Sequence, residues 1–412
     1  MRTSFSSFLQ RLALAMVNLF ESPLGSALTA AWVYFLVSGG AGRLFGPSHF
    51  AYYNYLADAF LHGQTWLRVL PQTTHDLVPY NGRYFLYWSP FPAVVLMPFV
   101  ALFGVQFNDV LFTICIASLD IALMSLLLRA ASRAGFLHLS KAQRALLIFF
   151  FAFGTVFFTL APYGKVWMTG QLIGFTCVLV AYLAAFSLHG SKAWFFTGLA
   201  LACAMLTRSH MVFTGIFPAV YLLFQEKPWN WKSVLSRLAW AALPLTIGLL
   251  VFLGYNVQRF GNPFEMGISY HNMDEIFRAD FNQYGAFNLH YLPINFFYQY
   301  IAYPFPLTQE SAMGGSLFLL SPLFVAAFAA FWKPRSKWFV FALAASILIT
   351  NIPILMLMGT GWVQFGPRYT LDFTVPLLLL TAIGMEKWSK ITPLLLTAVS
   401  VVQYTIGTIW LR

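Results

Sequence analysis

Two aspartates, Asp76 and Asp58, stand in stretches that are rich in tyrosine, tryptophan and histidine. Asp76 is in the run HDLVPYNGRYFLYWSPFP at 75–92, and Asp58 belongs to FAYYNYLADAFLH at 50–62. A carboxylate can take a proton from a hydroxyl that attacks an activated carbon, or it can steady a metal ion. Each aspartate also has a simpler interpretation, since Asp76 fits a turn or helix cap and Asp58 fits an exposed helix face.

Basic residues flanked by apolar residues form the second set of candidates. A cation in such surroundings needs an anionic partner, and a lipid phosphate or pyrophosphate is one. Arg368 has an alternative partner within the chain, because Asp372 follows at the helical spacing of an ion pair. Arg208 could equally extend to lipid headgroups. We expect a phosphate site built from a subset of Arg83, Lys165, Arg208, Arg259 and Arg368.

An Asn-Gly pair at 81–82 predicts a turn. The run YFLYW that follows alternates, with Tyr84 and Trp88 on one side. A short hairpin is therefore expected, and it would bring Asp76 and Arg83 close together while offering the two aromatic rings as substrate contacts.

A second polar stretch, YNVQRFGNPFEMGISYHN at 255–272, is rich in Asn, Gly and aromatic residues and contains Glu265 and His271. This composition is typical of an ordered loop over a site and not of a disordered linker. Glu265 and His271 are therefore candidate acceptor contacts.

The amino-acid composition limits the class of protein that can carry these residues. Of 412 residues, 59% are hydrophobic and 9% are charged, against roughly 45 to 50% and about 25% in a soluble domain. A soluble globular protein is thus excluded. The net charge of +11 does not indicate a nucleic-acid partner, because Lys and Arg cluster in short loops between apolar runs, as the positive-inside rule requires.

Apolar runs of sufficient length predict an all-α polytopic membrane protein with about eleven spans. The expected spans lie near 24–45, 108–130, 145–162, 170–189, 193–207, 210–225, 238–256, 313–331, 338–358, 369–385 and 391–411. A further run at 90–104 contains several prolines and is expected to lie in the membrane interface. If that run does not cross the membrane, every basic loop falls on the same side of the membrane. These loops carry Arg129, Arg133, Lys141, Arg144, Lys227, Lys232, Arg237, Lys333, Arg335 and Lys337.

The positive-inside rule then places the N-terminus in the cytoplasm and the C-terminus outside, in a plasma (inner) membrane. The chain is expected to be a single membrane domain, 1–412, with a first outer loop at 46–107 and a second large outer loop at 257–312. The candidate residues fall on the outer side.

The sequence resembles the GT-C superfamily of integral-membrane glycosyltransferases, in a plan shared with the protein mannosyltransferase and lipid A aminoarabinose transferase families. The resemblance rests on LADAFLHG at 56–63, HDLVPYNGRYFLYWSPFPA at 75–93, YNVQRFGNPFEMG at 255–267 and GPRYTLDF at 366–373. It implies a first span, an outer loop with two interfacial helices, and a helical bundle. It also implies transfer of a sugar from a polyprenyl-phosphate-linked donor on the outer side, to an acceptor that stays unknown.

This sequence departs from the superfamily pattern after the first span, where an acidic residue is usual. Here the chain reads GPSH at 46–49. The role of base therefore moves to Asp76 or Asp58, or His49 takes it. Lys165 occupies the second outer turn, where many relatives have an acid, and suits the donor phosphate better than a metal, which makes metal dependence doubtful. The main hypothesis is an inverting transfer in which Asp76 deprotonates the acceptor.

Two other classes stay open. A transporter of lipids or lipid-linked sugars would place polar groups near the membrane midplane and show internal repeats. We find no repeat relating the two halves of the chain, and the charged candidates gather on one face, which favours an enzyme. A catalytically inactive assembly partner with the same fold is the third class, because the acid is missing at 46–49.

Overall fold

The computed structural model describes residues 2–226, 230–333, 337–359, 361, 363–389 and 391–411. These residues form a helical bundle with two small two-stranded sheets. Strands β1 (Leu77–Tyr80) and β2 (Arg83–Leu86) are antiparallel, whereas β3 (Met313–Gly314) and β4 (Gln364–Phe365) are parallel. The predicted all-α polytopic fold is confirmed.

Five described helices are long and apolar enough to cross a membrane. They are α5 (Asp109–Arg133), α8 (Val166–Ser187), α11 (Trp231–Phe260), α16 (Lys337–Leu355) and α18 (Ile391–Trp410). The number is six if α1 (Arg2–Glu21) and α2 (Pro23–Ser38), which meet at an angle of 95°, count as one broken span. The count of about eleven stays a prediction.

Shorter helices complete the bundle. They are α6 (Lys141–Phe153), α7 (Phe157–Leu160), α9 (Gly190–Met205), α10 (Ile216–Phe224), α14 (Leu317–Leu320), α15 (Ala326–Ala329) and α17 (Thr374–Met385). Short 3-10 helices lie between them at Gly40–Arg43, Gly104–Gln106, Ser209–Gly215, Ile268–Tyr270, Leu289–Tyr291, Gln309–Ala312, Pro322–Val325, Ala330–Trp332 and Arg368–Phe373, with a π-helical turn at Phe297–Ile301.

The segment at 313–331, expected to be one continuous span, is instead broken into short helices. The break falls at Ser321 and Pro322. Proline has no N–H for the helix ladder and disfavours helical geometry in the residue before it, and Ser321 has φ −124° and ψ 67°. The expectation of a continuous helix here is wrong for that reason.

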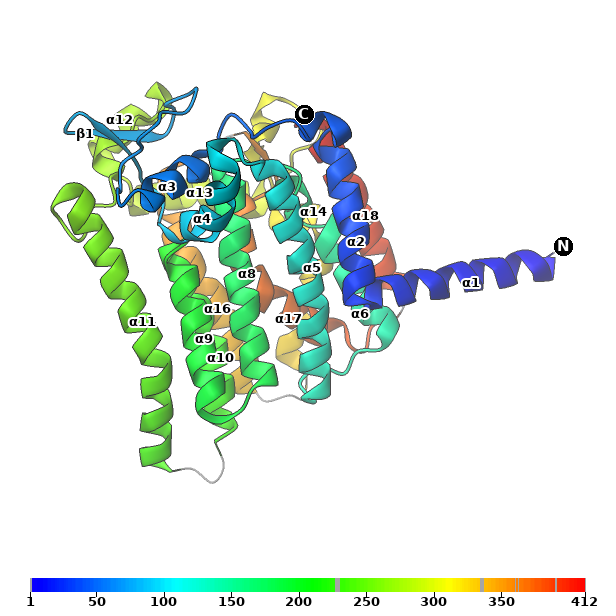
Figure 1. The fold of residues 1–412 in the computed structure, drawn as a ribbon. Coiled ribbons are helices and arrows are strands. Elements are labelled where there is room, and N and C mark those ends of the chain that lie inside the picture. Colours follow the sequence, from blue (N-terminus) through cyan, green and yellow to red (C-terminus); the bar gives the residue numbers. More distant parts are fainter. Residues whose placement is uncertain are drawn as a thin grey trace.

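One end of the bundle, which we call the loop end, carries the elements of both outer loops. Figure 1 shows α3 (Tyr52–Leu61), α4 (Phe91–Phe103), α12 (Glu275–Tyr284) and α13 (Leu292–Phe296) gathered there with β1. The helix predicted at 50–62 is confirmed as α3. Helix α4 has 13 residues, about 20 Å at 1.5 Å per residue, too short for a hydrocarbon core of about 30 Å. Its packing along α3 fits the expected interfacial placement.

The opposite end, which we call the basic end, collects the predicted basic loops. Helix α5 ends there at Arg133, and α6, α11 and α16 begin there, near Lys141, Lys232 and Lys337. Lys227 and Arg335 lie outside the described residues. The last turn of α18 lies at the loop end, where the hydroxyl of Tyr163 donates to the carbonyl of Thr408. Which end faces the cytoplasm stays a prediction.

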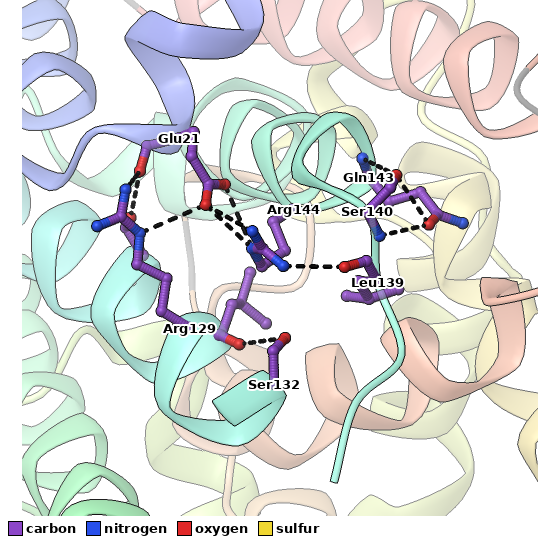
Figure 2. Close-up of polar contacts among 9 residues, drawn as sticks. Glu21, Arg129, Ser132, Leu139, Ser140, Gln143 and Arg144 are labelled. Atoms are coloured by element: carbon purple, nitrogen blue, oxygen red, sulfur yellow. Dashed lines mark hydrogen bonds and ion pairs between the residues drawn. The ribbon is translucent and has the colours of Figure 1, made fainter. Parts of the chain in front are cut away.

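An ionic joint at the basic end, the Glu21 clamp, fixes the bend between α1 and α2 (Figure 2). Arg144 donates to the Glu21 carboxylate from Nε at 3.1 Å and Nη2 at 2.7 Å, and Arg129 Nε lies 3.4 Å from the same carboxylate. Arg129 and Ser125 also donate to the Glu21 carbonyl. The clamp therefore ties the first bend of the chain to α5 and α6.

The core lies between α5, α6, α8 and α17 and is dominated by phenylalanine, including Phe151, Phe157 and Phe175. Every residue of α17 is buried. Gly384 allows its close approach to α15, because a Cβ there would overlap the carbonyl oxygen of Ala326. Small residues at helix–helix contacts let membrane helices approach closely and so gain van der Waals contacts.

Candidate active site

The predicted hairpin is confirmed, but it does not bring Asp76 and Arg83 together. The turn residues Asn81 and Gly82 have φ 48° and 72°, as a two-residue hairpin turn requires. Asp76 precedes β1 at the open end of the hairpin, whereas Arg83 begins β2 at the turn. Strands rise about 3.4 Å per residue, so the hairpin separates the two groups. The Arg83 guanidinium lies instead 3.8 Å from the ring of Trp66.

Asp76 meets His271, which comes from the loop after α11, and Trp167, which lies in the first turn of α8. Its Oδ1 atom lies 3.0 Å from His271 Nε2, and its Oδ2 atom accepts a hydrogen bond of 3.1 Å from Trp167 Nε1. The Asp76 side chain is 14% exposed. The carboxylate is therefore oriented by two ring nitrogens and still reaches solvent.

The backbone at Asp76 is held in an unusual conformation. Its φ of 62° lies in the left-handed region, where aspartate and asparagine are among the few tolerated side chains. The N–H of Asp76 donates to the carbonyl of Asn272, and the N–H of Asn272 donates back to Leu77. Tyr52 fixes the preceding carbonyl, that of His75, at 2.8 Å. The loop at 255–272 thus pairs with the edge of the hairpin, as a cover over a site would.

Aromatic rings surround this carboxylate. Tyr87 lies 4.6 Å from the His271 ring and 4.1 Å from Trp88 between centroids, and Trp88 lies 6.2 Å from Trp167. Burial raises the pKa of Tyr87 well above its ordinary value, Asp76 raises it further, and Arg368 lowers it. Tyr87 is therefore a neutral phenol that is influenced by both a carboxylate and a guanidinium.

Lys165 begins α8, two residues before Trp167. Its ammonium lies 5.8 Å from the ring of Phe50 and 5.9 Å from that of Tyr163. Within the described ranges it forms no ion pair with a carboxylate. Burial lowers the pKa of Lys165, and the positive charges of Arg368 and Arg43 lower it further. Lys165 is a desolvated cation with another cation for a neighbour.

Arg368 is the second cation without a carboxylate. It is buried, donates from Nη2 to the hydroxyl of Tyr369 at 3.1 Å, and has no hydrogen-bond partner for Nε among the residues that the structure describes. The ion pair that its spacing from Asp372 suggested is not formed. Residues 368–373 are a 3-10 helix, which aligns every third residue and not every fourth.

Asp372 is instead the centre of a buried ionic group, the Asp372 cluster, with Gln171, Arg208 and His210. Its Oδ2 atom lies 2.9 Å from Arg208 Nε and 2.6 Å from His210 Nε2, and its Oδ1 atom accepts from Gln171 at 2.7 Å. Arg208 therefore already has its counter-ion. The sequence signals were a buried acid and a histidine beside Arg208, but no local spacing connected them.

The remaining candidate bases have other partners. Asp58 pairs with Arg68 Nε at 3.1 Å, and the exposed His49 shares a hydrogen bond of 3.0 Å with Gln72. Beside His49, the N–H and hydroxyl of Ser48 each donate to Asp109 at 2.7 Å. A carboxylate thus does stand next to the first outer turn, although it comes from the start of α5.

Other predicted contacts are structural. Arg259 is buried beside the hairpin and donates to the carbonyl of Leu86 and to Asn256. Glu265 accepts bonds from the N–H of Gly267 at 2.6 Å and the hydroxyl of Ser269 at 2.7 Å, which closes its own loop.

Tyr84 packs with α3 and α4, and its carbonyl accepts from Leu67. Among the described residues, no three His, Cys, Asp or Glu side chains are grouped as metal ligands would be.

The structure thus assembles one group of candidates, which we call the loop-end site. Its polar members come from four separate segments, and its walls are aromatic. It consists of Asp76, Tyr87, Trp88, Lys165, Trp167, His271 and Arg368.

Two solved structures share this fold. ArnT from Cupriavidus metallidurans bound to undecaprenyl phosphate aligns with a TM-score of 0.52 and 15% identity, covering 90% of this chain and 60% of that one. The Archaeoglobus fulgidus oligosaccharyltransferase in its apo form aligns with a TM-score of 0.50 and 14% identity, covering 94% of this chain and 55% of that one. Both are GT-C superfamily glycosyltransferases.

This chain therefore has the GT-C fold and spans less than two thirds of the length of either neighbour. No protein-family model matches the sequence, and no curated protein matches it.

Proposed function

We propose that this chain transfers a glycosyl group from a polyprenyl-phosphate-linked donor to an acceptor hydroxyl at the loop end. The observation that carries the proposal is the presence of two cations that lack carboxylates, half-buried Lys165 and buried Arg368, in the same site as the oriented carboxylate of Asp76. The GT-C fold, and the undecaprenyl phosphate in ArnT, support a lipid phosphate as the missing anion.

Lys165 and Arg368 hold the donor phosphate. The unpartnered Nε of Arg368 supplies a donor, and the first turn of α8 has no side-chain cap, so the positive end of that helix also favours an anion. As the sugar leaves, charge builds on the phosphate oxygen. Preorganised cations in a water-poor site stabilise that charge, which is usually the largest electrostatic contribution to such a reaction.

Asp76 accepts the proton of the acceptor hydroxyl. The acceptor oxygen forms its bond to the anomeric carbon as the bond from that carbon to the phosphate oxygen breaks, so the configuration inverts. His271 and Trp167 hold the carboxylate in place. Tyr87 is close enough to both Asp76 and Arg368 to be influenced by their charges, and we place the sugar beside it.

Other candidates receive no phosphate role in this proposal. Arg208 is neutralised by Asp372, Arg259 is bonded to backbone, and Arg83 lies at the far end of the hairpin. Asp58, paired with Arg68, is not the base.

Asp76→Asn tests this function. Asparagine tolerates the left-handed backbone and can still accept the Trp167 bond, but it cannot take a proton. With purified protein and a panel of lipid-linked sugars, the transfer rate should fall by about 10²- to 10⁴-fold. Asp58→Asn is the matched control and should keep transfer within about threefold of wild type.

Near-wild-type transfer by Asp76→Asn would remove Asp76 from the mechanism. Flux of a lipid-linked sugar across liposomes without any transfer product would favour a transporter. Binding of the lipid with neither flux nor transfer would favour an inactive assembly partner.

The proposed orientation puts the loop end outside the cytoplasm, in keeping with the basic end facing in. A phosphatase fused after residue 412 should be active only outside, and a cytoplasmic location of that fusion would reverse the orientation.

A further inference from the structure

A groove on the membrane side of the loop end is not used by the donor site. It has a volume of about 450 Å³ and lies between α3, α4, the end of α9 and α11. Figure 1 shows α11 leaning away from α9 toward the loop end, and α11 is the least buried of the long helices. The apolar wall is formed by Phe60, Pro90, Phe91, Val94, Met97 and Val251.

The groove also has polar lining residues whose buried atoms lack partners. Thr65 and Tyr255 are 6% and 7% exposed, and neither hydroxyl has a hydrogen-bond partner within the described part of the chain. The same holds for Gln64 Oε1. Unsatisfied buried polar groups cost free energy, so their gathering beside a groove points to a ligand that satisfies them.

The chemistry of these atoms selects the kind of ligand. Gln64 Oε1 can only accept a hydrogen bond, whereas the hydroxyls of Thr65 and Tyr255 accept or donate. A fully ionised phosphate offers only acceptors and would leave Gln64 unsatisfied. A headgroup with free hydroxyls can satisfy all three atoms, and a long hydrocarbon chain fits the apolar wall.

The polar end of the groove lies near the Asp372 cluster. Tyr53, on α3, is close enough to Tyr255 and to Arg208 for both to act electrostatically on its phenol. The Tyr53 hydroxyl also abuts α8 at Gly170, where a Cβ would approach it to 2.7 Å. Tyr53 is thus a neighbour of both Tyr255 in the groove and Arg208 in the Asp372 cluster.

We propose that this groove binds a lipid with a hydroxyl-bearing headgroup, and that this lipid is the acceptor of the reaction. The acceptor role of the lipid rests on the function proposed above. Binding of the lipid to the groove can be tested without any transfer.

The test uses the full chain in phosphatidylcholine nanodiscs, with bound lipid counted by native mass spectrometry. The probes are a monoglucosyl diacylglycerol and a phosphatidic acid with the same acyl chains. The glucosyl lipid should bind at least about tenfold better than phosphatidic acid. Tyr255→Phe and Thr65→Val should each weaken its binding by about two- to tenfold, because each removes one hydrogen bond.

Val94→Trp fills the groove and should abolish binding of the glucosyl lipid. Leu102→Trp is the matched control, since Leu102 lies on the same helix but outside the groove and is 77% exposed. Equal binding by the two tryptophan variants, or a preference for phosphatidic acid, overturns the proposal. Retained binding of undecaprenyl phosphate by Val94→Trp shows that the variant is folded and that the donor site is separate.

Discussion

The Glu21 clamp at the basic end and the loop-end site both gather two cations and one carboxylate in a partly buried setting, yet only the cations of the clamp contact their carboxylate. In the clamp, Arg129 and Arg144 share one carboxylate and also bond to carbonyls. In the loop-end site, neither Lys165 nor Arg368 has a carboxylate among the residues described. Cations that contact a carboxylate form a joint, whereas cations without such a contact stay available to an anion.

The Asp372 cluster shows that two arginines in similar places can have different partners. It lies beside the loop-end site, and the guanidiniums of Arg208 and Arg368 lie 5.1 Å and 4.9 Å from the same Tyr369 ring. Arg208 has its carboxylate and Arg368 does not. Contact with a carboxylate, and not position near the site, therefore distinguishes Arg208 from Arg368.

The largest effect is expected on stability, from Asp372→Asn. This change leaves the charge of Arg208 buried without a counter-ion, which costs about 3–5 kcal/mol. Unfolding in detergent should shift accordingly. Asp280→Asn, at an exposed position of α12, should shift it very little. A stability loss no larger than that of the control would show that the Asp372 cluster is not a joint.

Arg368→Gln should act on binding and not on stability. It removes a cation that has no carboxylate, so the affinity for undecaprenyl phosphate should fall by about 10- to 100-fold, while the unfolding midpoint stays equal to or above that of wild type. Arg83→Gln, which removes an exposed cation over Trp66, should leave affinity unchanged. Loss of stability without loss of affinity would reverse the comparison.

Glu21→Gln should lower stability and leave binding unchanged, and the stability loss should be smaller than that of Asp372→Asn. The Glu21 clamp is partly open to solvent, with Arg129 35% exposed, so we expect a loss of about 1–2 kcal/mol. Undecaprenyl phosphate should bind as in wild type, as measured by titration. Weaker binding would mean that the basic end is coupled to the site.

The smallest effect concerns pH. The pKa of Lys165 is lowered by burial and by Arg368 and Arg43, so its charge is present below that lowered pKa and is lost as pH rises through it. As pH rises, binding of undecaprenyl phosphate should therefore begin to decline at a lower pH than it would with a lysine of ordinary pKa. Lys165→Arg keeps its charge and should extend binding to higher pH. Coinciding profiles for the two proteins would exclude Lys165 from the phosphate site.

Local patterns predicted the local structure. The Asn-Gly pair gave the turn of the hairpin, the apolar spacing at 50–62 gave α3, and the basic loops marked one end of the bundle. Each of these features depends on residues that are close in the chain, where periodicity and turn chemistry act directly.

The pairings within the site could not be predicted, because they join distant segments. Asp76 and His271 are 195 residues apart, and both were candidates without being linked. Arg368 and Asp372 illustrate the opposite error. Their spacing suggested a helical ion pair, but the 3-10 geometry of 368–373 turned Asp372 toward Arg208 and left Arg368 free for another anion.

The Asp372 cluster also sets an order of events during biosynthesis. Arg208 and His210 precede Asp372 by 164 and 162 residues, so they leave the ribosome long before their counter-ion exists. Most of the bundle is inserted while this arginine is unneutralised. The last two helices, α17 and α18, follow Asp372 directly. Arg208 therefore gains its counter-ion only when the final segment of the chain is synthesised. A chain that ends before Asp372 would leave Arg208 unneutralised beside the loop-end site.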